Sequence, residues 1–161
     1  LDDSLSPVEK QGKLKVLQGI LTSIDASVQT IIFTSFRKSV TFIDNMLGHK
    51  SLRFLAGNEE RHPNLDRFKA GEVPYLVSTP QSLGVGTNLQ NASCIIFMDL
   101  PLSYRLYRQC IGRVVRMGQE GQPVIYHIIA EKTVDDVIQN LITSKQTNFD
   151  QTLHLQRWQY S

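Results

Sequence analysis

Apolar positions along the chain follow two different periods, and their alternation predicts a regular succession of helices and strands. In the segment 13–24, leucine and isoleucine recur every three or four residues, which is the period of an amphipathic helix. Residues 30–34 instead form a short β-branched run, typical of a buried strand. The same reasoning predicts further strands at 52–55, 74–78, 93–99 and 124–129, and helices at 40–47, 64–70, 103–117 and 134–145.

The predicted strands are apolar along most of their length, which indicates a sheet with both faces covered. Strands of this kind occur in parallel sheets, where the crossover helices pack on the two faces. We therefore expect an α/β fold, with a doubly wound, mostly parallel sheet between two layers of helices. Ligands of such folds bind at the carboxyl ends of the strands, so function is expected in the segments that follow them.

The helix predicted at 103–117 carries the first candidate chemistry. At about 100° per residue, Gln109, Arg113 and Arg116 fall on one face of that helix. A guanidinium is always charged and binds phosphate in a bidentate way, so this face is a candidate phosphate site. A glycine inside a helix costs roughly 1 kcal/mol, and Gly112 therefore indicates close approach by a ligand or another backbone. The alternative interpretation is a basic face exposed to solvent.

The segment after the predicted strand 74–78 carries a second group of candidate phosphate-binding residues. Ser78, Thr79 and Ser82 offer hydroxyl groups to phosphates, and the glycines that follow let backbone amides approach a ligand closely. The alternative is a glycine-rich turn between a strand and a helix.

These segments resemble, in order, the motifs of superfamily-two helicases. Gln-x-x-Gly-Arg-x-x-Arg at 109–116 resembles motif VI, and Met-Gly-Gln at 117–119 resembles the ending of that motif in Swi/Snf-type DNA translocases. The segment 78–89 resembles motif V, and the strand 30–36 followed by Arg37 resembles motif IV. Gly112 stands where Swi/Snf proteins usually have Asp, a departure typical of a divergent member, such as a viral or prokaryotic one.

The resemblance implies a RecA-like C-terminal motor lobe of an ATP-dependent nucleic-acid translocase. Arg113 and Arg116 would then be catalytic arginine fingers. The residues implied near ATP are Gln109, Gly84, Gly86 and Gly112. The residues implied to contact nucleic acid, with double-stranded DNA favoured, are Ser35, Phe36, Arg37, Gly57, Ser78, Thr79, Ser82 and Asn88.

The sequence lacks the phosphate-binding pattern Gly-x-x-x-x-Gly-Lys-Ser/Thr, because its Gly-Lys pair at 12–13 is followed by Leu14. The resemblance assigns that loop, and most of the binding of ATP and Mg, to an N-terminal RecA-like lobe of the same polypeptide. This chain alone is therefore expected to be inactive, and its start at Leu1 suggests a fragment. The alternatives are a strand-separating DNA or RNA helicase lobe and a non-catalytic scaffold for protein partners.

Composition adds few constraints. The 161 residues fit one domain, and a net charge of +2 is too mild to identify a nucleic-acid binder. Cys94 and Cys110 are interpreted as buried thiols, with no metal-ligand spacing around them and no metal site expected. No apolar run reaches the roughly 20 residues of a membrane span, so an intracellular, soluble protein of cytoplasm or nucleus is expected. We divide the chain into a leading helix and linker (1–28), the RecA-like domain (29–146) and a C-terminal tail (147–161).

Overall fold

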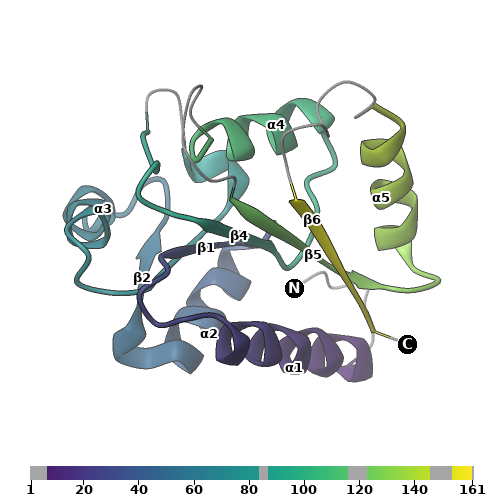
Figure 1. Ribbon diagram of the computed structural model, residues 1–161, viewed down its shortest axis with the longest axis horizontal. Helices are drawn as coiled ribbons and strands as arrows, with labels where there is room; N and C mark the ends of the chain where they lie inside the picture. Colours follow the sequence, from purple (N-terminus) through teal and green to yellow (C-terminus); the bar gives the residue numbers. More distant parts are fainter. Residues whose placement is uncertain (1–6, 84–86, 116–122, 146–153, 161) are drawn as a thin grey trace.

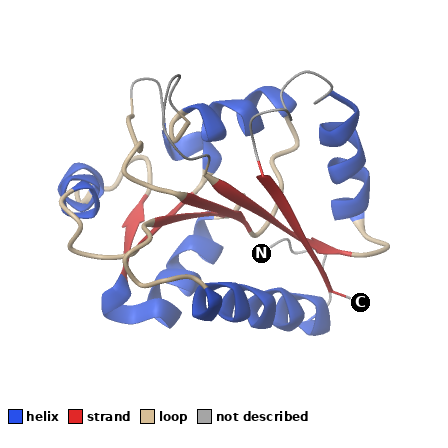
Figure 2. Cartoon of the chain, viewed as in Figure 1, coloured by secondary structure: helices blue, strands red, loops and turns tan. Residues whose placement is uncertain are grey.

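The computed structural model describes residues 7–83, 87–115 and 123–145, together with the backbone of 154–160. Helices and strands alternate along these residues, as the apolar pattern predicts (Figures 1 and 2). The helices are α1 (Pro7–Ser23), α2 (Arg37–Leu47), α3 (Arg61–Lys69), α4 (Tyr104–Gly112) and α5 (Val134–Lys145), with short 3₁₀ turns η1 (Gly48–Lys50) and η2 (Pro80–Leu83). The strands are β1 (Thr30–Phe33), β2 (Ser51–Phe54), β3 (Tyr75–Ser78), β4 (Cys94–Phe97), β5 (Val124–Ala130) and β6 (His154–Tyr160).

The six described strands form one sheet in the order β2-β3-β1-β4-β5-β6, and every neighbouring pair is parallel. β1 lies in the middle, where Ile32 is in register with Val77 of β3 and Ile96 of β4. All four residues of β1 and of β4 are buried, because helices cover both faces of the sheet. The predicted α/β fold with a doubly wound parallel sheet is confirmed.

Helices cover the two faces in two separate apolar cores (Figure 1). On one face, α1 and α2 contribute Leu17 and Ile43, which pack against Ile32 and Ile96 of the sheet. On the other face, α3, α4 and α5 supply a second buried cluster, which includes Phe68, Tyr107 and Ile138. The chain runs from β1 toward one edge with α2 on the first face, and from β4 toward the other edge with α4 on the second. Crossovers of a single hand require this arrangement.

Both ends of the chain pack on the sheet. α1 contains most of the helix predicted at 13–24 and is part of the core, because Leu17 and Ile20 are fully buried against the sheet. In the tail, where no element is predicted, residues 154–160 form β6, which pairs with β5 along its whole length. The division of the chain at residues 28 and 146 remains a prediction. None of the described helices combines the length and apolar character needed to cross a membrane.

Candidate functional site

Three segments that follow strands meet at one edge of the sheet, as expected for candidate site residues at strand ends. Arg37, the first residue of α2, donates from Nη1 to the carbonyl oxygen of Ala56 at 2.9 Å. The amide of Ala56 in turn donates to Oγ of Ser82 in η2, at 3.1 Å. These hydrogen bonds join the segments after β1, β2 and β3, and we call the region around Arg37, Ala56 and Ser82 the junction.

The three predicted hydroxyl residues lie inside this junction. Ser78, Thr79 and Ser82 are all buried, with at most 4% of each residue exposed. Ser78 Oγ donates to the carbonyl oxygen of Phe54 at 2.7 Å, and Oγ1 of Thr79 lies 2.7 Å from Oγ of Ser82. In this conformation the hydroxyls hold the strand ends together, so a phosphate could reach them only after a rearrangement.

Arg61 of α3 completes the junction from the neighbouring helix. Its guanidinium lies 4.6 Å from the centre of the Phe54 ring and donates from Nη2 to the carbonyl oxygen of Ser82 at 2.8 Å. Nε of Arg61 is buried and has no hydrogen-bond partner among the described residues. The positive charge of Arg61 thus lies directly beside η2.

Arg37 and Gly57 form the exposed part of the same surface. Arg37 is exposed at the start of α2, where the N-cap residue Phe36 provides no side-chain hydrogen bond to the first turn. Gly57 is exposed in the loop after β2, with a φ of 85° that favours glycine. Basic side chains, an uncapped helix start and a glycine loop are therefore adjacent.

Helix α4 presents the residues predicted to contact ATP, but it is shorter than expected. It begins after Ser103, whose Oγ accepts a hydrogen bond from the amide of Leu106 at 3.4 Å. It ends at Gly112, with Arg113 as C-cap, whereas the sequence predicts a helix to residue 117. The carbonyl oxygen of Arg113 accepts the amide of Leu89 at 2.9 Å, a bond that ties this turn to the segment after η2.

The predicted face of Gln109, Arg113 and Arg116 stays a prediction as a whole, because Arg116 lies outside the described residues. Gln109 and Arg113 still come together, because both line a cavity of about 100 Å³ between η2 and α4. Gln109 is exposed and Arg113 is half-buried. Gly112 ends the helix, and an added Cβ there would meet no described atom within 4 Å, so packing within the described chain does not require a glycine.

Several predicted residues lie apart from this cavity or outside the described chain. Asn88 is exposed, and its Oδ1 accepts the amide of Gln90 at 3.0 Å. Gly84, Gly86 and Arg116 lie outside the described residues, as does the Met-Gly-Gln sequence at 117–119. Ser35 and Phe36 line a different, larger cavity.

A buried ion cluster near the same strand ends was not predicted. Lys13 of α1 is fully buried, and its Nζ lies 2.5 Å from Oδ2 of Asp135 and 3.6 Å from Oδ1 of Asp99. Nζ also donates to the carbonyl oxygen of Met98 at 2.8 Å. In the sequence, the only indication of this cluster is that Lys13 lies on the apolar side of a predicted helix, next to Gly12.

A network of buried polar side chains lies between α4, β5 and α5. Oη of Tyr107 lies 2.8 Å from Nε2 of His127, and Nδ1 of His127 lies 2.7 Å from Oε1 of Gln139. Nε2 of Gln139 then donates to Oγ1 of Thr143 at 3.1 Å. His127 is fully buried, and these hydrogen bonds connect α4 to β5 and α5.

The two thiols are buried structural groups. Burial raises the pKa of Cys94 and of Cys110 to about 12, although the positive charge of Arg113 acts to lower the pKa of Cys110. Both are therefore protonated near neutral pH and poor nucleophiles. Within the described parts of the chain, no group of three or more His, Cys, Asp or Glu side chains is placed to hold a metal ion.

Comparison with known proteins identifies the family. Residues 12–118 match the model of the helicase conserved C-terminal domain, which is more than half of the chain. The chain belongs to the helicase C-terminal domain family. The matched residues thus include most of α1, the junction at the strand ends and the predicted motif VI.

Two relatives of this helicase C-terminal domain carry different names. "Helicase SWR1" of Gibberella zeae is 32% identical over 143 residues, which cover 84% of this chain and 8% of the relative. "ATP-dependent RNA helicase DBP3" of the same organism is 26% identical over 151 residues, or 88% of this chain and 26% of the relative. The chain thus spans only a small part of the relatives that it matches.

The fold also matches a solved helicase structure. The C-terminal part of the Fun30 ATPase domain superposes with a TM-score of 0.72 at 24% identity, covering 86% of this chain and 48% of that one. This match supports the RecA-like fold.

Proposed function

We propose that this domain is the C-terminal motor lobe of an ATP-dependent nucleic-acid translocase. The observation that carries the proposal is the cavity between η2 and α4, which Gln109 and Arg113 line together. A half-buried guanidinium beside an exposed amide suits the negative oxygens of a nucleotide, since charge-assisted hydrogen bonds are strongest where water is partly excluded.

In this proposal ATP and Mg are held mainly by an N-terminal RecA-like lobe of the same polypeptide. The lining of the cavity fits the phosphate end of the nucleotide, because its only charged side chain among the described residues is that of Arg113. Arg113 and Arg116 would neutralise charge on the phosphate oxygens as arginine fingers. Gln109 would orient the same group, with Gly84, Gly86 and Gly112 providing backbone access.

We further propose that the Arg37 side of the junction contacts the nucleic-acid backbone. Arg37 and the exposed Lys38 lie in the first turn of α2, where backbone amides favour anions. Gly57 and Asn88 are also exposed, in the segments after β2 and η2. Contacts of this kind are to phosphate, so binding should depend strongly on salt and little on sequence.

The test uses the polypeptide that carries both lobes. Arg113→Ala and Arg116→Ala should each lower nucleic-acid-stimulated ATP hydrolysis by about 10³–10⁵-fold, the usual effect of losing an arginine finger. Arg105→Ala is the matched control, because Arg105 is exposed on the same helix and does not line the cavity between η2 and α4. Hydrolysis that survives both finger substitutions, or that falls equally with Arg105→Ala, would reject the assignment.

Double-stranded DNA is the substrate that we favour, from the Met-Gly-Gln sequence after Arg116 and the relative named Helicase SWR1. A strand-separating RNA helicase is the second candidate, because DBP3 is named an RNA helicase. Stimulation of the ATPase by duplex DNA, single-stranded DNA and RNA distinguishes the two. Absence of hydrolysis with all three would favour a non-catalytic scaffold.

A further inference from the structure

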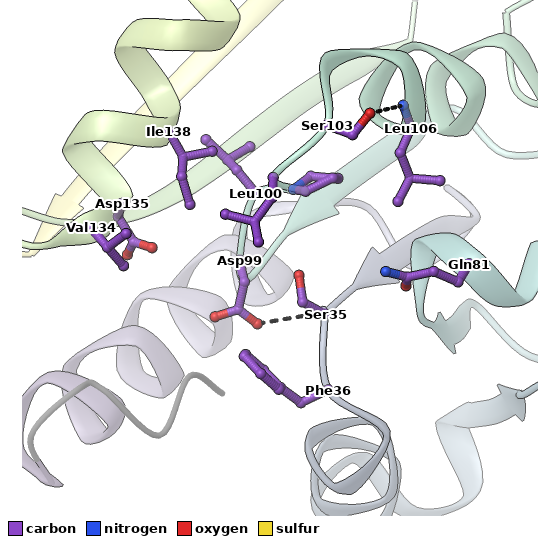
Figure 3. Close-up of a pocket in the computed structure, with 12 residues that line it drawn as sticks. Ser35, Phe36, Gln81, Asp99, Leu100, Ser103, Leu106, Val134, Asp135 and Ile138 are labelled. Atoms are coloured by element: carbon purple, nitrogen blue, oxygen red, sulfur yellow. Dashed lines mark hydrogen bonds between the residues drawn. The ribbon is translucent and has the colours of Figure 1, made fainter.

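A second cavity, larger than the one beside Arg113, lies at the carboxyl ends of β1 and β4. Its volume is about 360 Å³, within the usual range for ligand pockets. Its lining comes from the segments after β1 and β4, from η2 and from the starts of α4 and α5. We call it the Asp99 pocket, because the carboxylate of Asp99 lies between Asp135, Ser35 and Phe36 in the close-up (Figure 3).

The charge of the Asp99 pocket is negative. Asp99 and Asp135 line it, and none of its described lining residues is Lys, Arg or His. Lys13 contacts both carboxylates and is itself fully buried, so one ammonium faces two carboxylates. With all three groups ionised the cluster carries one net negative charge, which repels phosphate and attracts a cation.

Asp99 also retains an unused acceptor. Its Oδ2 accepts the hydroxyl of Thr34 at 2.5 Å, whereas Oδ1 has no hydrogen-bond partner among the described residues. Oδ1 lies 3.6 Å from Nζ of Lys13, longer than the usual 2.7–3.2 Å of an N–H···O bond. Asp99 is only 4% exposed and Oδ1 is itself buried, so Lys13 compensates its negative charge only in part.

The walls and rim of the pocket are apolar. Leu100, Leu106 and Ile138 line the interior, and the rim carries Leu102, which is 82% exposed. Val134, also in the lining, begins an exposed apolar row on α5 that continues through Val137 and Leu141. Long basic side chains bury apolar stems along such walls while their charged ends reach polar partners.

We propose that the Asp99 pocket binds a lysine or arginine side chain that another polypeptide presents between apolar residues. The cationic end would lie against the carboxylates of Asp99 and Asp135, and the flanking apolar residues would cover Leu102 and Val134. This protein-binding role is independent of the ATP site, and it gives Ser35 and Phe36 a function other than contact with nucleic acid.

The test is an NMR titration of the ¹⁵N-labelled chain at low salt with the blocked peptide acetyl-Leu-Arg-Leu-amide. The control peptide replaces Arg by citrulline, which has nearly the same shape and no charge. The arginine peptide should shift the amides of Ser35, Leu102 and Val134. The citrulline peptide should bind about tenfold more weakly, because a charge-assisted hydrogen bond is lost.

Protein variants localise the effect. Asp99→Asn should weaken the arginine peptide by about tenfold, and Leu102→Ser should weaken both peptides without disturbing the fold, since Leu102 is exposed. Asp66→Asn is the matched control, because Asp66 is an exposed carboxylate on α3 and its loss changes net charge equally. If Asp99→Asn does not fold, the citrulline comparison and Leu102→Ser still decide.

Four results would overturn the proposal: no binding of the arginine peptide, equal affinity for the citrulline peptide, shifts confined to other surfaces, or an equal loss with Asp66→Asn. A duplex oligonucleotide that displaced the peptide from these three amides would assign the pocket to nucleic acid instead. None of these results depends on ATP hydrolysis, so they are distinguishable from failure of the proposed motor function.

Discussion

At the scale of single residues, Lys13 shows how burial changes the meaning of a charged side chain. The sequence presents it only as part of a Gly-Lys pair that cannot form a phosphate-binding loop. In the structure it connects α1 to the end of β4 and the start of α5 through Asp99, Asp135 and the carbonyl of Met98. All three partners lie far from Lys13 in the sequence, so no local pattern could have revealed them.

Removing this ammonium should be strongly destabilising. Lys13→Met keeps the length of the side chain but leaves two buried carboxylates facing each other, which should lower the free energy of unfolding by about 3–5 kcal/mol. Lys15→Met is the matched control, because Lys15 is exposed on the same helix and should change stability by less than about 0.5 kcal/mol. Urea denaturation monitored by circular dichroism measures both. Equal stability of the two variants would show that the cluster contributes little.

At the scale of elements, the apolar period was sufficient to locate each of the first five strands and their helices. Period and burial agree in Ile31–Phe33, whereas in Val134–Lys145 the buried side includes Asp135 and Gln139 as well as Ile138 and Ile142. Gly48 is the C-cap of α2, with a φ of 62°. Oγ1 of Thr133, the residue before α5, accepts the amide of Asp135 at 3.1 Å.

The helix predicted at 103–117 shows where period fails. Tyr107, Ile111 and Val114 are buried as its pattern requires, yet α4 ends at Gly112. A glycine favours helix poorly, and the carbonyl of Arg113 accepts the amide of Leu89. That bond is tertiary, so the position of Arg113 relative to Gln109 could not be derived from helical geometry alone.

The Tyr107–His127–Gln139 chain should stabilise α4 in its position. Tyr107→Phe removes the hydroxyl that lies 2.8 Å from His127 Nε2, and should lower the free energy of unfolding by about 1–3 kcal/mol, since the loss occurs in the core. Tyr104→Phe, one turn earlier and only half-buried, should change it by less than about 0.5 kcal/mol. Thermal and urea unfolding of both variants provide the comparison, and similar values would contradict a stabilising role for the Tyr107 hydroxyl.

At the scale of the whole molecule, the order of motifs predicted more than composition did. A net charge of +2 indicates no partner, whereas the succession of segments after β1, β3 and β4 predicted the family that the match over residues 12–118 establishes. The sequence did not predict that Ser78, Thr79 and Ser82 would be buried, because each bonds to a segment distant in the chain or to a neighbour across the turn. It also did not predict β6, whose residues lack a clear strand period.

The proposed division of labour between two lobes makes a prediction for this chain alone. The charged side chain that lines the η2–α4 cavity is a guanidinium, which can neutralise phosphate but cannot replace the phosphate-binding loop that this sequence lacks. The purified 161-residue chain should therefore show no ATP hydrolysis above background, with or without duplex DNA or RNA. Phosphate release is the measurement, with the two-lobed polypeptide as positive control. Residual activity that Arg113→Ala leaves unchanged would come from a contaminating ATPase. Stimulated activity that Arg113→Ala abolishes would show that this chain forms a complete site, and that result would refute the two-lobe proposal.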